Sequence, residues 1–589
     1  MAYRPNLLTI APGSPFLETL ADALLDGRLV TGFAPRWDPL ALASATIYLP
    51  TRRAIRALRT VFLDRLGTGA VLLPRLLALG EIDDEEEAFD ADIPGLLQPV
   101  GGLDRQIALT RLILQWSSAI RKALLPLPGA EEALLVPSSP GDAAGLAADL
   151  GKFLDGMQID RVPPSALAIL SESHAGLYDQ YWDLTVRFLE IATVHWPEHL
   201  AEIGRGDAVL LRNARLEMEA ARLAVNPAAG PVIVAGSTGS IPATRDLIKA
   251  VAAHAHGAVV LPGLDLDLDL AGWTALGQGD KVPGHPQAGL SSLLAAIGTD
   301  RDGVAVLGEP PSALALRAAL VSQALRPAET TDLWADWRGN DAGATEQAFA
   351  GVTLAEAAHE GEEALVAALA LREALTMPGR TAALVTPNRQ LAGRVVTELG
   401  RWGIAADDSA GRPLLGIPPG LFARLVLDAA LNDFEPIALL ALLKHPFSHL
   451  GMPRGMVRQA VMVLEIGALR GPHPAAGIAG LTGALAQGKT SLADPHCPAA
   501  RLALSAEDWA SAEALLQALD AALEPFAALL RTTKICPAAE FFAAHRLAVE
   551  ATAAPIEGEE SMLYADEPGQ ALEAFFGDLA LAVDQPPAA

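Results

Sequence analysis

Short apolar runs alternate with amphipathic stretches over the first part of the chain. The run at 7–10 leads through a Pro/Gly turn into a helical pattern at 16–25, and the run at 45–49 leads into a second helical pattern at 52–66. In this second pattern the apolar residues recur at the spacing that gathers them on one helix face. Strands that each feed a helix are typical of a parallel α/β sheet.

The same strand–helix pattern returns after a long interruption. Residues 231–245, PVIVAGSTGSIPATR, combine an apolar strand at Val232–Ala235 with a Gly/Ser/Thr turn and a helix start at Pro242, and the next strand is predicted at 257–265. Between about 102 and 222 the spacing of apolar residues is helical throughout. The pattern therefore predicts one α/β domain that a helical insertion interrupts.

A third block predicts a second βαβ unit, and beyond about 421 the chain is Ala/Leu-rich and helical almost to its end. The block has strands at 352–355 and 381–386 and helices at 360–375 and 389–402. Two parallel α/β domains, each interrupted by a large helical insertion, are the layout of the RecA-like domains of superfamily 1 helicases. The chain is expected to end before the second α/β domain closes. The first α/β domain is expected at 1–101 and 226–345, with its helical insertion at 102–225. The second α/β domain is expected to begin at 346–421, and a second helical insertion follows at 422–589.

Length and composition limit the class of protein. With 589 residues the chain is expected to hold several domains. No window of about 18 residues lacks charges or breakers, so no membrane span is expected, and the N-terminus does not resemble a signal peptide. Two cysteines, Cys497 and Cys536, cannot build a disulfide framework or a four-cysteine cluster. The expected location is the cytoplasm.

Charge is unevenly distributed along the chain. The net charge of −27 argues against a protein that coats nucleic acid generally, because affinity for phosphate comes from Lys and Arg. Residues 51–75, however, contain six arginines and one acid, and a strongly acidic run follows at 81–92. A local basic patch on an acidic body fits a protein that holds nucleic acid in a channel beside a partner. It fits a solvated surface equally well.

The first strand–helix turn lacks the residues that bind a triphosphate. A nucleotide-hydrolysing core would have G-x-x-x-x-G-K-[ST] at this place, with backbone N–H groups and a lysine around the phosphates. The turn instead has the sequence APGSPF at 11–16, in which Pro12 and Pro15 each lack an N–H donor. No lysine precedes Lys122. The turn is therefore predicted not to bind ATP.

A literal P-loop match, GALAQGKT, occurs at 483–490. It would use Lys489 as the phosphate-binding lysine. Its upstream sequence is Gly/Ala-rich instead of strand-like, and Pro495 breaks the chain soon afterwards. A chance match is favoured, and a P-loop ATPase that uses Lys489 remains as an alternative.

Other clusters of histidines and acids also lack a complete catalytic pattern. The H-x-x-E-H sequence at 195–199 is interrupted by Pro197, which disfavours the unbroken helix that a zinc site needs. The acids at 265–269 and at 407–408 lack the E-x-K partner of a two-metal nuclease, and are expected to form a capped loop and a turn. No catalytic residue and no metal ligand is predicted.

Four segments together carry a resemblance to a known family. They are the stretch 231–245, HPQAGL at 285–290, TPNRQLAGRV at 386–395 and DDSAGRPL at 407–414. In this order they resemble the AddB subunit of bacterial AddAB helicase–nucleases, over nearly the whole chain. The resemblance implies an inactivated helicase-like part that works on DNA ends in double-strand break repair.

The resemblance also implies partners and missing parts. An AddA-type helicase–nuclease subunit would supply the ATP-driven motor, and the substrates would be double-stranded DNA ends and single-stranded DNA. In the family, a nuclease with Mg²⁺ and in some members an iron–sulfur cluster lies in the C-terminal half. None of those residues is present here, so no cofactor is expected in this chain. It looks like a fragment without the nuclease and is predicted to be inactive alone.

The candidate DNA-binding residues follow strands of the two predicted α/β units. The segment 51–54 resembles the helicase segment that contacts the DNA backbone, the turn 236–240 could hold a phosphate through backbone N–H groups, and 386–389 stands at the corresponding strand end of the second unit. Hydroxyl, Asn and Arg groups are suitable phosphate donors. A chain that binds only a protein partner is the other alternative. The predicted DNA contacts are Thr51, Arg52, Arg53, Arg56, Ser237, Thr238, Asn388 and Arg389.

Overall fold

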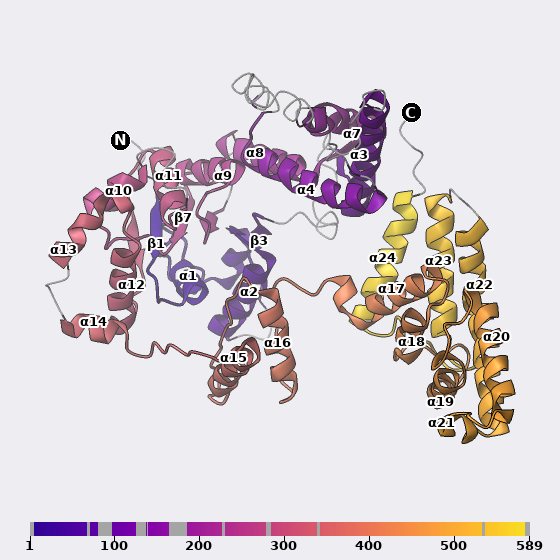
Figure 1. Cartoon of the computed structure of the whole chain (residues 1–589). Helices are drawn as coiled ribbons and strands as arrows, with labels where there is room; N and C mark the ends of the chain where they lie inside the picture. The colour runs from indigo at the N-terminus through magenta and orange to yellow at the C-terminus, as the bar shows by residue number, and fades with distance from the viewer. Residues whose placement is uncertain are drawn as a thin grey trace. The chain divides into compact units, whose positions relative to one another are not determined.

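The chain forms two compact units. The first unit contains residues 1–101 and 108–355, and the second contains 102–107 and 356–589. In the computed structural model (Figure 1), the residues that are described are 5–67, 71–80, 97–124, 137, 139–163, 166, 185, 187–225, 230–277, 284–337, 342–532 and 536–583.

A six-stranded parallel sheet is the centre of the first unit. Its strand order is β3-β2-β6-β7-β1-β8, and every neighbouring pair is parallel. The predicted α/β class is therefore confirmed, and strands form at four predicted places, those of β1, β2, β6 and β7. The six strands are β1 (Leu7–Ile10), β2 (Thr46–Leu49), β3 (Arg75–Ala78), β6 (Val232–Ala235), β7 (Gly257–Pro262) and β8 (Ala305–Leu307).

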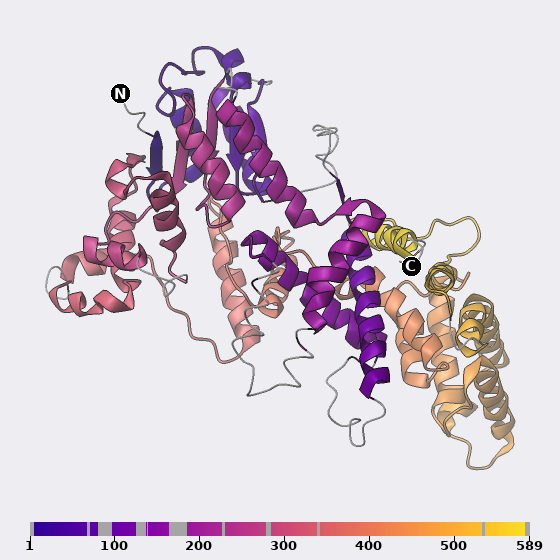
Figure 2. The ribbon, with the colours of Figure 1, turned by 90° about the horizontal axis from the view of Figure 1, so that it is seen from above.

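Helices cover both faces of this sheet, as Figure 1 and the view from above in Figure 2 show. Strand side chains alternate between the two faces, because successive residues of a strand point in opposite directions. Ile10 and Ile47 pack with α1 (Phe16–Leu25) and α2 (Arg52–Leu66). On the opposite face, Leu7 and Tyr48 pack in the core formed with α8 (Ala208–Val225), α9 (Pro242–Ala253) and α11 (Ala288–Ile297). The sheet is therefore the middle layer of three.

A helical segment lies between β3 and β6 in the chain. Its core surrounds the buried Trp196, whose Nε1 donates to Asp207 Oδ2 at 3.0 Å. A short parallel pair, β4 (Gln98–Pro99) with β5 (Arg205–Gly206), joins the two ends of this segment. The described helices of the segment are α3 (Gly102–Leu124), α4 (Pro140–Ile159), the π-helical turn η4 (Ile191–His195), α7 (Trp196–Ile203) and α8.

Short helices complete the first unit around the last two strands. Between β7 and β8 lie α10 (Leu270–Gly277), α11 and the turn η5 (Arg301–Gly303), and the chain leaves β8 into α12. The other helices are η1 (Pro39–Ser44), α12 (Ser312–Ala324), η6 (Ala328–Leu333), α13 (Trp334–Trp337) and α14 (Ala342–Ala348).

The second unit begins with two helices, α15 (Glu360–Leu375) and α16 (Arg389–Gly400), which pack through a small core of Ala364, Ala368, Val395 and Leu399. The strands predicted at 352–355 and 381–386 are not formed. A strand needs a neighbour that takes up its N–H and C=O groups. Within 342–532 and 536–583 no strand exists to pair with these segments, and Leu354 and Val385 are 86% and 93% exposed. The second predicted sheet is therefore absent from these ranges.

The rest of the second unit is helical, as predicted. Its core contains the fully buried side chains of Phe422, Trp509 and Phe526. Among the residues that the structure describes, no helix combines the length and apolar character needed to cross a membrane. The helices are η7 (Leu414–Gly416), α17 (Pro418–Leu431), α18 (Pro436–Lys444), α19 (Arg454–Leu464), η8 (Glu465–Leu469), α20 (Gly477–Thr490), η9 (Ser491–Ala493), α21 (Ala499–Leu502), α22 (Ala506–Thr532), α23 (Ala538–Ala553) and α24 (Glu567–Val583).

Candidate nucleic-acid interface

Two of the predicted DNA-binding segments follow neighbouring strands of the sheet. β2 pairs with β6 in parallel, with Tyr48 opposite Val234. The segments 51–56 and 236–240 therefore begin at the same carboxyl edge of the sheet, although about 180 residues separate them in the chain. The structure brings Thr51, Arg52, Arg53, Arg56, Ser237 and Thr238 to one edge.

The first turn of α2 presents the arginines of this edge. Thr51 is the N-cap of α2, and its Oγ1 accepts the N–H of Ala54 at 3.2 Å. Ile55, Leu58 and Phe62 are buried against the sheet. This orientation leaves Arg53 and Arg56 exposed, with Arg52 half-buried beside them, and Arg59 one turn further along. A helix N-terminus and a group of arginines both favour an anion.

The turn 236–240 follows β6, and its first N–H group, that of Gly236, still donates to the C=O of Val260 in β7 at 2.9 Å. Gly236 and Gly239 have φ angles of +79° and +63°, in the left-handed region that glycine tolerates. The Gly239 N–H is used by the turn itself, since Ser237 Oγ accepts it at 3.3 Å. The N–H groups of Ser237, Thr238 and Ser240 donate to no acceptor in the described part of the chain. Such groups, at the N-terminal end of α9, can bind a phosphate oxygen.

Arg245 holds this turn in shape, although it was not among the predicted residues. It lies in the first turns of α9, and its Nε donates to the C=O of Gly239 at 3.1 Å while its Nη2 donates to the C=O of Ser240 at 3.4 Å. Through these two bonds, Arg245 holds the carbonyls of Gly239 and Ser240 towards α9. The signal that could have revealed it is an arginine placed shortly after a Gly/Ser turn at a helix start.

Asn388 and Arg389 belong to the second unit, where both side chains take part in local structure. Asn388 Oδ1 accepts the N–H groups of Gln390 at 3.0 Å and Leu391 at 3.2 Å, so it caps α16. Arg389 makes a two-point contact with Asp408, at 3.0 and 2.6 Å. This hydrogen bond from Arg389, together with that of the Ala410 N–H, lowers the pKa of the Asp408 carboxyl. Asp408 therefore begins a turn, as predicted, since its C=O accepts the N–H of Gly411 at 3.2 Å.

The degenerate turn after β1 is packed and closed. The Ser14 N–H donates to the C=O of Ala11 at 3.1 Å, which removes one more donor from a turn that already contains two prolines. Pro15 is the N-cap of α1 and gives it no side-chain cap. Gly13 has φ +86°, and a Cβ at this position would lie 2.8 Å from Leu314 Cβ. The loop therefore lacks most of the donors of a phosphate-binding loop, and Gly13 is packed against α12.

The P-loop-like sequence at 483–490 lies within α20. Backbone N–H groups in a continuous helix are bonded along the helix and cannot surround a phosphate. Lys489 Nζ instead contacts Glu513 Oε1 of α22 at 3.0 Å. The alternative of a P-loop at Lys489 is wrong for this structure.

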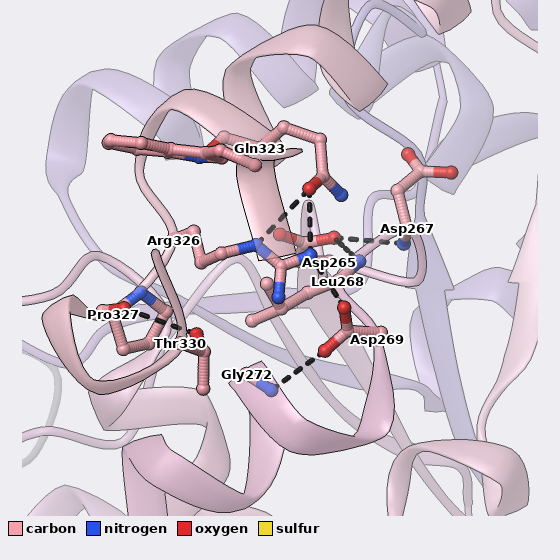
Figure 3. Close-up of polar contacts among 10 residues, drawn as sticks. Asp265, Asp267, Leu268, Asp269, Gly272, Gln323, Arg326, Pro327 and Thr330 are labelled. Carbon is pink, nitrogen blue, oxygen red and sulfur yellow. Dashed lines mark hydrogen bonds and ion pairs between the residues drawn. The ribbon is translucent and has the colours of Figure 1, made fainter. Parts of the chain in front are cut away.

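The acidic loop after β7 is capped internally, as predicted (Figure 3). Asp265 Oδ1 accepts the N–H groups of Asp267 and Leu268, each at 2.9 Å. Asp269 Oδ1 accepts the Gly272 N–H at 2.8 Å and its Oδ2 contacts Arg326 at 2.5 Å. Asp265 and Asp269 therefore cap the loop. Across the described ranges, no group of three or more His, Cys, Asp or Glu side chains could hold a metal ion.

The fold places the first unit among three-layer α/β proteins with an all-parallel sheet. Comparison with protein-family models gives no match, and comparison with curated proteins gives no significantly similar sequence.

Proposed function

We propose that the carboxyl edge formed by β2 and β6 binds the phosphate backbone of DNA. The observation that carries the proposal is the pairing of these two strands. It brings to one edge of the sheet the exposed arginines of α2, the N-termini of α2 and α9, and N–H groups of the turn 236–240 that have no acceptor among the described residues. Each of these groups favours a phosphate, and phosphate contacts position DNA without reading its sequence.

The wider role in this proposal comes from the resemblance to AddB. The chain would be the helicase-like, ATP-incompetent part of a subunit that processes double-strand DNA ends for recombinational repair, in the cytoplasm and beside an AddA-type motor. The closed turn at 11–16 is consistent with ATP incompetence. In this proposal α15 and α16 belong to a second RecA-like domain. Its extended segments 352–355 and 381–386 would become strands only beside partner strands, and those are not among the described residues.

A double variant at the exposed arginines tests the proposal. Arg53→Ala with Arg56→Ala removes two cations from the edge while Thr51 still caps α2. Binding of single-stranded DNA and duplex ends should weaken without sequence preference. The slope of log K against log salt should flatten by up to about two units. The measurement is fluorescence anisotropy of labelled DNA over a salt series.

The matched control is Lys249→Ala, which removes an exposed cation from the far end of α9. It should leave the salt slope unchanged. If the double variant binds DNA as tightly as the unmodified chain at low salt, the arginines are only solvated surface. A protein that binds only a protein partner would then be the better explanation.

A further inference from the structure

A cavity of about 540 Å³ lies at the carboxyl ends of β1, β7 and β8, beside α12. The chain continues from β1 to β2 on one side of the β1–β7 pair, and from β7 to β8 on the other. Neighbouring parallel strands with connections in opposite directions leave a crevice at their carboxyl ends. In open α/β sheets this crevice is the usual place of a ligand.

Hydrogen bonds from Thr9, Gln287 and His285 hold the walls of this β1–β7 cavity. Thr9, only 1% exposed, donates from Oγ1 to the C=O of Leu261 at 3.2 Å and accepts the N–H of Leu264 at 3.1 Å. The Gln287 side chain spans the loop after β7. Its Nε2 donates to the C=O of Gly263 at 3.0 Å, and its Oε1 accepts the N–H of Asp265 at 3.1 Å. His285 Nε2 bonds at 2.8 Å to the C=O of Leu325, the residue that follows α12. The cavity is therefore preformed.

Four large apolar side chains around the cavity are partly open to solvent. Large apolar residues are normally covered, and a cluster of exposed ones at a concave site marks a place where a ligand binds. The four that line this cavity are about half exposed: Leu266 45%, Val306 50%, Val321 46% and Leu325 46%.

Two carboxylates, those of Asp265 and Asp267, line the cavity beside neutral polar groups and one arginine. The Asp267 carboxylate accepts no hydrogen bond from any residue that the structure describes. Burial and the neighbouring Asp265 raise the pKa of the Asp267 carboxyl. Ser322, 6% exposed, has a buried hydroxyl without a hydrogen-bond partner in the same described ranges. Arg317 also lines the cavity, but it donates at 2.9 and 2.6 Å to the carbonyls of Ala348 and Ala350.

We propose that the β1–β7 cavity binds a compact apolar molecule that carries a protonated amine. The ammonium lies against the Asp265 and Asp267 carboxylates, and the apolar body lies against Leu314 and Val321 of α12. A nucleotide is disfavoured, because its phosphates would meet the Asp265 and Asp267 carboxylates. The inference is independent of the DNA-binding proposal, since it uses other residues and another ligand.

Three probes of one shape separate charge from apolar contact: 4-phenylbutylammonium, 4-phenylbutanol and 4-phenylbutyrate. Titrated against the full chain and followed by ligand-observed NMR, the ammonium should bind most tightly and the carboxylate most weakly. Asp267→Asn should weaken the ammonium about tenfold, the effect of one charge-assisted contact, and leave the alcohol unchanged.

A second variant tests the place of binding. Val321→Trp should fill the mouth of the cavity and abolish binding of all three probes, and the half-exposed site should tolerate the larger ring. Leu40→Trp, at a 71% exposed position of η1, is the matched control and should bind as the unmodified chain does. Circular dichroism checks that both variants fold. Equal affinity for the three probes, binding that survives Val321→Trp, or no binding up to about 10 mM would each overturn the proposal.

Discussion

Replacing Asp269 by Asn should loosen the contact between α10 and the segment after α12. The Arg326 side chain is 3% exposed and donates from Nη2 to Asp269 Oδ2 at 2.5 Å and to Gln323 Oε1 at 2.7 Å (Figure 3). Asp269→Asn keeps the oxygen that accepts the Gly272 N–H, so the cap of α10 survives. The substitution replaces Oδ2 by an NH2 group, so the buried guanidinium loses both the compensating charge and a hydrogen-bond acceptor.

The size of this effect follows from the burial of the two partners. Removing one partner of a fully buried ion pair costs about 3–5 kcal/mol, because the other charge is left uncompensated. Asp269 is 43% exposed, so water partly replaces the lost charge, and we expect a cost of about 2 kcal/mol, below that range. This cost raises the equilibrium constant for local opening of α10 and α12 by about 30-fold.

Hydrogen-exchange mass spectrometry of the full chain measures this opening in α10 and α12. Asp265→Asn is the matched control, because Asp265 caps the same loop without pairing to Arg326, and it should leave α12 protection unchanged. Asp269→Asn combined with Arg326→Met removes both charges and should recover most of the lost protection. Unchanged exchange in the single variant, or a double variant that opens more than the single one, would refute the reasoning.

Two further predictions concern the pH dependence of stability in the second unit and the absence of ATP binding. Burial lowers the pKa of His445 and of His545, so both are neutral when folded and take up a proton on unfolding below about pH 6.5. The contribution of the two neutral histidines to the stability of α17 and α23 is therefore fully present above that pH. It falls as the pH drops towards the folded pKa values, by about 1.4 kcal/mol per pH unit for each histidine. Hydrogen exchange at α23, corrected for intrinsic rates, checks this, and the dependence should lessen in His545→Phe and persist in the exposed control His496→Gln. Calorimetric titration with Mg-ATP should show no binding to the full chain, and Lys489→Ala should change nothing; micromolar binding that this variant abolishes would contradict the helical assignment of 483–490.

The central strands could be predicted because local signals coincide at them. β1, β2, β6 and β7 are buried runs followed by turn residues, and α2 begins where Thr51 supplies a cap. β3 and β8 are short strands at the two edges of the sheet, with Arg75 exposed in one and Val306 in the other, and neither was predicted. The segment 381–386 has the opposite character. It is apolar and strand-like in sequence, but a strand forms only beside a partner, which local sequence does not reveal.

The candidate interface was predictable only in its parts. Arginines at 52–56 and a Gly/Ser turn at 236–240 are visible in the sequence, whereas their adjacency depends on the long-range pairing of β2 with β6. The cavity was missed for a related reason. Gln287 and His285 occur in a recognisable motif, but their partners lie in β7's loop and at the end of α12, so their role as wall contacts follows only from the fold.

The chemistry of the sheet edge changes along its length because the loops differ while the strands do not. All six strands present their carboxyl ends at one edge. After β6 the turn has glycines with positive φ, and the N–H groups of Ser237, Thr238 and Ser240 have no acceptor within the described ranges, which favours an anion. After β1 the turn has two prolines and a closed hydrogen bond, and after β7 the loop supplies carboxylates, which together disfavour an anion and favour a cation. A parallel sheet thus offers the same geometric site at each strand end, and the residues of each loop decide which charge that site accepts.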